Sequence, residues 1–314
     1  MSSFKTLLLA HHTGDDPATR FAIQQFGERV AQRSGGLLNI ADMPGSALGN
    51  IPAMLRMVMA GEADMALAPM DRLCELLPKF GCVGMPFVFD DLAHADRVLN
   101  GPFADWAMPD LRQRGLHSLS SWEWGFRQIS NNRHPILNPD DMHGLRIRVP
   151  PILQYQEAML ALGCVPVIVE FAQLASVIRQ GLVDGQENPV AIIRAYRLYE
   201  NQCHLTLLDY SYGAMLHIVN RKNFESLSTE HQQIISEESH HAARAMCSLV
   251  RSQQAAQLEE LLGFGMQIVL PERAPFRQAM TGARHHLATR FGEARTRTFL
   301  DMVEHMRQPP EVST

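Results

Sequence analysis

The 314-residue sequence lacks the features that mark several large classes of protein. No window approaches the roughly twenty consecutive apolar residues of a membrane-spanning helix, which argues against direct insertion into a membrane. The formal net charge is -5 and no basic patch is visible, which argues against a nucleic-acid partner. The catalytic motifs HExxH and GxSxG, the phosphate-binding P-loop and the dinucleotide-binding motif GxGxxG are all absent from the sequence. It therefore carries no recognised catalytic motif, and we expect no cofactor.

Cysteine and metal-binding patterns are also sparse. The five cysteines are widely separated, with no CxxC pair, and we interpret them as core thiols rather than as a disulfide framework. Histidines are adjacent at 240–241 and at 285–286. Within each pair the two side chains cannot easily bind the same metal ion, because neighbours on a helix point about 100° apart. We therefore expect no metal site.

The N-terminus has little of a secretory signal. The stretch MSSFKTLLLAHHTGDD contains only a four-residue apolar run and no small-residue cleavage site. Taken literally, it predicts a soluble cytosolic protein. In the alternative interpretation, Met1 stands in place of an export signal that has been removed.

Apolar runs alternate with amphipathic stretches in the first part of the chain. The runs at 6–10, 37–44 and 63–69 predict strands, and the stretches at 17–34 and 51–60 predict helices. Strands and helices that alternate at short spacing are typical of an α/β fold, with parallel sheets covered by helices on both faces.

The second part of the chain repeats this alternation. Strands are predicted at 145–150 and 165–169, with helices at 152–162 and 171–180, and LVDGQENP at 182–189 is interpreted as a tight connection. Between about Thr229 and Leu262 the chain has no proline or glycine, which predicts one long helix that could run across two lobes.

Two arginines stand two residues apart in the predicted strand GLRIRVP, residues 144–150. Side chains alternate along a strand, so Arg146 and Arg148 share one face. Arg148 lies one residue from the carboxyl end of the strand, where open parallel sheets place small-molecule sites, and its planar fork matches a carboxylate. An arginine buried there would need an anion. The alternative is a half-exposed strand with a charged outer face.

Several motifs extend this pattern over nearly the whole chain. After GLRIRVP come ALGCVPVIVEF and QGLVDGQENP, then YENQCHLTLLDYSY; before it come SGGLLNIADMPGSALG, GEADMALAP, MPFVFDD and GFRQISNNRHPI. In content and order they resemble the DctP-type solute-binding subunits of tripartite ATP-independent periplasmic (TRAP) transporters.

The resemblance implies a fold, a location and partners. It implies a two-lobed, hinged α/β protein of the periplasmic-binding-protein type, with a long helix bridging both lobes. One lobe would take residues 1–125 plus 212–252, and the other 126–211 plus 253–314. Such a protein closes on a small organic carboxylate in the periplasm and delivers it to the membrane subunits of the transporter. A monomer is the default expectation.

The resemblance also implies a binding site. Arg148 matches the arginine that clamps the ligand carboxylate, Arg127 a second pocket arginine, Asn188 a polar contact and Phe171 the aromatic that covers the ligand. Positions that vary with the ligand, or at which family members commonly carry histidine or tyrosine, are His12, Asn50, Met70, Tyr210 and Tyr212. Their polar groups suggest a hydroxylated acid, such as a uronate or aldonate; the alternatives are a C4-dicarboxylate or a 2-keto acid.

Two other functions stay open at this point. An enzyme acting on a small acid could use Asp184 or Glu187 as its base, since paired carboxylates can run hydrolysis when their pKa values differ. However, Gly185 between them is typical of a turn, and in the family these carboxylates brace the hinge or the ligand arginines. A sensor subunit would share the pocket and differ only in its partner.

Overall fold

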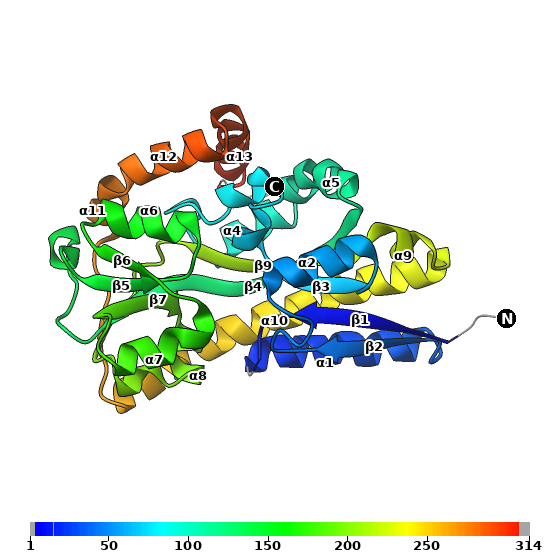
Figure 1. Cartoon of the computed structure of the whole chain (residues 1–314), viewed down its shortest axis with the longest axis horizontal. Helices are drawn as coiled ribbons and strands as arrows, with labels where there is room; N and C mark the ends of the chain where they lie inside the picture. Colours follow the sequence, from blue (N-terminus) through cyan, green and yellow to red (C-terminus); the bar gives the residue numbers. More distant parts are fainter. Residues whose placement is uncertain (1–3, 15, 308–314) are drawn as a thin grey trace, which may run out of the picture. The chain divides into compact units, whose positions relative to one another are not determined.

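The structure is a computed structural model that describes residues 4–14 and 16–307. The chain forms two compact units. The first unit comprises residues 1–77, 96–124 and 214–251, and the second unit comprises 78–95, 125–213 and 252–314. Some elements contribute residues to both units, namely helix α4 (Leu92–Leu99), strands β4 (Leu116–Asn131) and β9 (Tyr212–Asn220), and helix α10 (Thr229–Gly263) (Figure 1).

The first unit is built on a mixed sheet. Strand β1 pairs in parallel with β2 and β3, while β9 runs antiparallel to β3. The expected parallel pairing is confirmed for β1, β2 and β3, but the sheet also contains an antiparallel strand, because β9 returns to this unit from the second one. The elements that lie wholly in this unit are β1 (Lys5–His11), α1 (Pro17–Arg33), β2 (Leu38–Met43), α2 (Ile51–Ala60), β3 (Met65–Pro69), α3 (Met70–Leu73), α5 (Pro102–Gln113) and α9 (Arg221–Glu225).

Local sequence explains where the helices of the first unit begin. The Asp16 carboxylate accepts a hydrogen bond from the Thr19 amide at 3.1 Å and caps α1, with Pro17 at the first helical position. The buried face of α1, which includes Phe26, packs with strand residues and with α10 in one apolar core. The predicted helices at 17–34 and 51–60 are confirmed, as is the long helix α10.

The second unit is a mixed sheet between two apolar cores. Strand β5 pairs in parallel with β6 and β7, while β4 runs antiparallel to β7 and β8. Figure 1 shows α6 and α7 on opposite sides of β5, β6 and β7, and each helix contributes to a separate core. Its strands are β5 (Arg146–Val149), β6 (Val165–Ile168), β7 (Gly185–Pro189), β8 (His204–Thr206) and β10 (Gln267–Val269). Its helices are η1 (Pro78–Cys82), η2 (Pro139–Met142), α6 (Leu153–Ala161), η3 (Phe171–Gln173), α7 (Leu174–Arg179), α8 (Val190–Ala195), η4 (Leu198–Glu200), α11 (Arg273–Ala279), α12 (Thr281–Phe291) and α13 (Glu293–His305).

Strand β7 corrects one interpretation made from sequence. Residues 182–189 look like a turn because they are polar and contain glycine, yet Gly185–Pro189 form a fully buried strand. Gly185 is needed for close packing, since a Cβ there would collide with the Ser130 carbonyl oxygen and come within 2.8 Å of Ile147. The strand stays buried because its polar side chains bond to residues distant in sequence, such as the pair Gln186 Nε2 and Ser130 Oγ at 2.8 Å.

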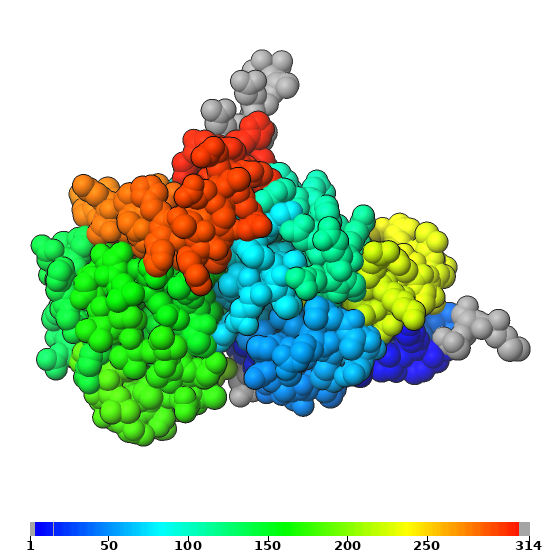
Figure 2. All heavy atoms as spheres, turned by 45° about the horizontal axis from the view of Figure 1, so that its top comes forward, coloured from blue at the N-terminus to red at the C-terminus, as the bar shows by residue number. Residues whose placement is uncertain are grey.

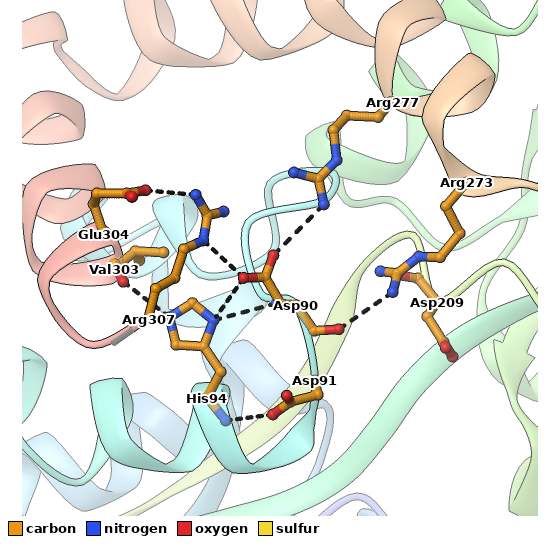
Figure 3. Close-up of polar contacts among 9 residues, drawn as sticks. All are labelled: Asp90, Asp91, His94, Asp209, Arg273, Arg277, Val303, Glu304 and Arg307. Carbon is orange, nitrogen blue, oxygen red and sulfur yellow. Dashed lines mark hydrogen bonds and ion pairs between the residues drawn. The ribbon is translucent and has the colours of Figure 1, made fainter. Parts of the chain in front are cut away.

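Residues 78–95 belong to the second unit, although the predicted division assigned all of 1–125 to one lobe. The Phe87 amide donates to the Tyr210 carbonyl at 2.7 Å. The Asp90 carboxylate accepts from Arg307 Nε at 2.8 Å, and Arg273 Nη1 donates to the Asp90 carbonyl at 3.2 Å (Figure 3). Figure 2 likewise shows the cyan segment against the orange and red C-terminal helices. These partners lie more than a hundred residues downstream, where a chain-local prediction cannot find them.

Candidate functional site

Arg148 is a deeply buried cation near the carboxyl end of β5. Its exposed fraction is 1%, and its Nε donates to the carbonyl oxygen of Val169 at 2.8 Å. Arg146, two residues earlier on the same strand, is exposed over 44% of its side chain and pairs with Asp184 at 2.9 Å. The two arginines that sequence places on one face therefore have different surroundings, and only Arg148 is buried.

Arg127, on β4, is held by a carboxylate of the protein itself. Its guanidinium forms an ion pair with Glu187 on β7, donates to Asn188 Oδ1 at 3.3 Å, and lies 4.4 Å from the centre of the Tyr155 ring. Burial by itself would lower the pKa of Arg127, but the charge of Glu187 and its hydrogen bond raise that pKa well above its ordinary value. Arg127 is thus a fixed, permanently charged group.

Tyr210 supports this pair. Its ring is fully buried, and its hydroxyl donates to Glu187 Oε2 at 2.7 Å. Burial, followed by the charge of Glu187, raises the pKa of Tyr210 well above its ordinary value. The hydroxyl predicted to face a ligand therefore donates its hydrogen to Glu187, a geometry that favours a positioning role for Tyr210. Tyr212 lies instead in an aromatic cluster, with its ring 5.5 Å from Phe89 and 5.4 Å from Phe126.

Asn188 and Phe171 occupy different parts of the second unit. Asn188 is 5% exposed, and its Nδ2 donates to Gln186 Oε1 at 2.5 Å. Phe171 begins the short helix η3 and is only partly buried, with its ring 4.7 Å from that of Tyr196. The structure thus joins Arg127 and Tyr210 through Glu187, and Asn188 to the same group through Arg127, while Phe171 packs against Tyr196.

His12, from the first unit, directly follows β1. Its ring meets Trp124 edge to face, with centroids 5.1 Å apart. Burial, and then the charges of His11 and Arg72, lower the pKa of His12 to about 3, so the imidazole is neutral at physiological pH. No local signal in the sequence shows that Trp124 contacts His12.

Asn50 and Met70, also in the first unit, have clear structural roles. The Asn50 side chain accepts a hydrogen bond from the Ala53 amide at 3.0 Å and caps α2, so its oxygen already has a backbone partner. Met70 opens α3 directly after β3 and is 1% exposed. Asn50 therefore stabilises a helix start, whatever else its amide nitrogen contacts.

The two carboxylates considered as a catalytic base are both engaged by arginines. The hydrogen bond from Arg146 lowers the pKa of Asp184, and Glu187 accepts from both Arg127 and Tyr210. A carboxylate stabilised in its ionised form is a weak base, so this geometry does not favour proton abstraction.

The described residues contain no group of three or more His, Cys, Asp or Glu side chains placed to hold a metal ion. Across residues 4–14 and 16–307, none of the helices has the length and apolar character needed to cross a membrane. Of the five cysteines interpreted as core thiols, Cys203 is exposed.

Comparison with known proteins places this geometry in a family. The family described as bacterial extracellular solute-binding protein, family 7 (DctP), matches residues 9–289, and the chain belongs to it. The resemblance to TRAP solute-binding subunits and the expected two-lobed α/β fold class are confirmed.

Individual relatives agree with this assignment. The 2,3-diketo-L-gulonate-binding periplasmic protein YiaO of Escherichia coli K12 is 28% identical over 277 residues, which are 88% of this chain and 84% of that protein. A TRAP periplasmic solute-binding protein from Ochrobactrum anthropi matches with a TM-score of 0.90 at 28% identity, covering 98% of this chain and 97% of the other. The sugar acid binding protein DctPAm from Advenella mimigardefordensis, in complex with galactonate, has a TM-score of 0.90 at 26% identity, covering 97% and 99%.

Proposed function

We propose that this chain captures a small organic carboxylate, with a sugar acid such as an aldonate or uronate as the preferred class. It binds its ligand without changing it, in the periplasm, and passes it to the membrane subunits of a TRAP transporter. Arg148 and Arg127 together neutralise the ligand carboxylate, and hinge closure excludes water. The protein acts as a monomer.

The observation that carries this proposal is the burial of Arg148 near the carboxyl end of β5. A guanidinium stays charged in proteins, and its planar fork matches the two oxygens of a carboxylate. Strand ends in open α/β sheets are the usual places for small ligands. A carboxylate that binds here gains charge-assisted hydrogen bonds, each of about 1.5–3 kcal/mol.

Arg127 contributes through a second, fixed positive charge. Because Glu187, Asn188 and the Tyr155 ring hold its guanidinium in one orientation, little conformational freedom is lost when a ligand arrives. We assign Tyr210 to the same support, and Phe171 to the cover of the ligand. His12, Asn50, Met70 and Tyr212 stay predicted ligand contacts.

The ligand class is supported by named relatives. Their ligands are galactonate for the Advenella protein, a hydroxylated acid, and a diketo-gulonate for the Escherichia coli protein, a hydroxylated acid that is also a 2-keto acid. The C4-dicarboxylates and 2-keto acids are the competing classes that an experiment must separate from them.

A thermal-shift screen on ligand-stripped protein tests the proposal. The panel holds aldonates, uronates, C4-dicarboxylates, 2-keto acids and the matched neutral sugars. A ligand at 100 times its dissociation constant adds about 2.7 kcal/mol of stability, so the proposal predicts a clear shift with an acid and none with its neutral counterpart. Mass spectrometry after long incubation should recover the ligand unchanged. Stabilisation by neutral sugars alone, or conversion of the acid, would overturn the proposal.

A further inference from the structure

Two aromatic side chains of the first unit each keep a buried ring nitrogen for which the described residues provide no hydrogen-bond partner. These atoms are Nδ1 of His12 and Nε1 of Trp124. The two rings are in contact, with centroids 5.1 Å apart and planes at 79°. Buried polar atoms are ordinarily satisfied by protein, water or ligand, so each such atom calls for an explanation.

A second tryptophan and a buried histidine of this unit have partners. Trp122 lies two residues before Trp124 on β4, and its Nε1 donates to Ser120 Oγ at 2.9 Å. His217 is fully buried as well, and its Nδ1 lies 2.8 Å from Ser239 Oγ. Among these four aromatic side chains, the unsatisfied nitrogens therefore occur only where His12 and Trp124 meet.

The location of His12 points to a ligand rather than to a packing defect. His12 directly follows β1, whose carboxyl end lies at the same edge of the sheet as that of its parallel neighbour β3. Open sheets bind small molecules at this edge. A polar group that arrives here would satisfy both nitrogens when it binds.

The chemistry of the two nitrogens restricts that group. The indole nitrogen can only donate a hydrogen bond, whereas a neutral imidazole has one donor and one acceptor nitrogen. Burial keeps His12 neutral, with a pKa of about 3. With the proton of His12 on Nε2, the pair offers one donor, Trp124 Nε1, and one acceptor, His12 Nδ1. A hydroxyl group can bond to both atoms, whereas a carboxylate can only accept from Trp124 Nε1.

We propose that Trp124 and His12 recognise a hydroxyl group of the ligand and so favour a polyhydroxylated acid over a dicarboxylate. This inference rests on the proposed function and deepens it, because it adds Trp124 as a specificity-determining residue. The pair discriminates through hydrogen-bond polarity, independently of the arginines that bind the ligand carboxylate.

Isothermal titration calorimetry with matched ligands tests this pair. The probes are D-galactonate and adipate, which share a six-carbon chain but carry hydroxyls in one case and a second carboxylate in the other. Wild-type protein should bind galactonate more tightly than adipate. His12→Phe removes the acceptor and keeps an aromatic ring, so the affinity for galactonate should fall about tenfold, while that for adipate, which cannot use the acceptor, changes less than about twofold. Trp124→Phe removes a donor that a hydroxyl and a carboxylate can both use, so the affinity for both ligands should fall.

Trp122→Phe is the matched control for Trp124→Phe. It also removes an indole N–H, but one that already bonds to Ser120, so both affinities should stay as in wild type. Melting curves of the ligand-free variants report whether each one folds. If His12→Phe leaves the affinity ratio unchanged, Trp124→Phe leaves both affinities unchanged, or wild type prefers adipate, the inference is overturned while the proposed function stands. If wild type binds no acid of the wider panel, the proposed function itself fails, and the inference with it.

Discussion

Arg127 and Arg148 are both buried in the second unit, but the groups that surround them differ. Arg127 is 6% exposed and forms an ion pair with Glu187, whereas Arg148 is 1% exposed and donates through Nε to the Val169 carbonyl. In the first arrangement the protein supplies the carboxylate. For the second we propose a ligand carboxylate, because Arg148 lies near the carboxyl end of a parallel strand, where open α/β sheets place small ligands. Burial alone does not distinguish a structural arginine from a ligand-binding one.

The largest effect on stability is expected from breaking the first arrangement. Glu187→Ala leaves the Arg127 charge buried without its carboxylate and removes the acceptor of the Tyr210 hydroxyl. Removing one partner of a buried ion pair typically costs about 3–5 kcal/mol. Urea unfolding of ligand-free protein should show a loss of this size. A loss below about 1 kcal/mol would mean that Arg127 finds another partner and that the pair is not structural.

Tyr210→Phe should have a smaller effect of the same kind. It removes one hydrogen bond to the buried Glu187 carboxylate, worth about 1.5–3 kcal/mol, and keeps the ring. Tyr199→Phe is a suitable control, because the Tyr199 ring is partly exposed and stacks on Phe264. If ligand affinity falls in Tyr210→Phe while stability does not, the hydroxyl contacts the ligand directly and the positioning role is wrong.

The smallest effect is expected at Arg146, the partly exposed arginine of β5. Arg146→Ala should reduce stability less than Tyr210→Phe does, because its pairing with Asp184 is screened by solvent. The Arg146 hydrogen bond lowers the folded-state pKa of Asp184, so this contribution is present above the ordinary carboxyl range and is lost as pH falls through the lowered pKa. The difference in the free energy of unfolding between wild type and Arg146→Ala should therefore shrink as the pH is lowered. A difference that stays constant with pH would show that the pairing does not contribute to stability.

The elements predicted best are those whose signals are local. Asp16 and Asn50 cap the starts of α1 and α2, and the absence of proline and glycine between 229 and 262 is enough to predict α10. Strand β7 and the packing of residues 78–95 could not be predicted, because both depend on partners far away in the sequence.

The candidate site divides in the same way. Alternation along β5 gives the positions of Arg146 and Arg148, but not which of them is buried. The ion pair between Glu187 and Arg127 depends on the antiparallel pairing of β4 with β7. The hydrogen bond that Glu187 accepts comes from Tyr210, which lies 23 positions further along the chain. Contact between His12 and Trp124 likewise joins residues of β4 and of the loop after β1.

The affinity of Arg148→Ala for the best acid of the thermal-shift screen tests the central claim most directly, with Arg146→Ala as the control on the same strand. The account predicts that Arg148→Ala weakens binding at least about 100-fold, since a charge-assisted, two-pronged contact is lost, while Arg146→Ala changes affinity less than about twofold. Arg148→Lys keeps the positive charge but lacks the planar fork of the guanidinium, so its ligand affinity should lie between those of Arg148→Ala and Arg146→Ala. If Arg148→Ala folds and binds the acid as tightly as Arg146→Ala does, Arg148 is not the carboxylate clamp.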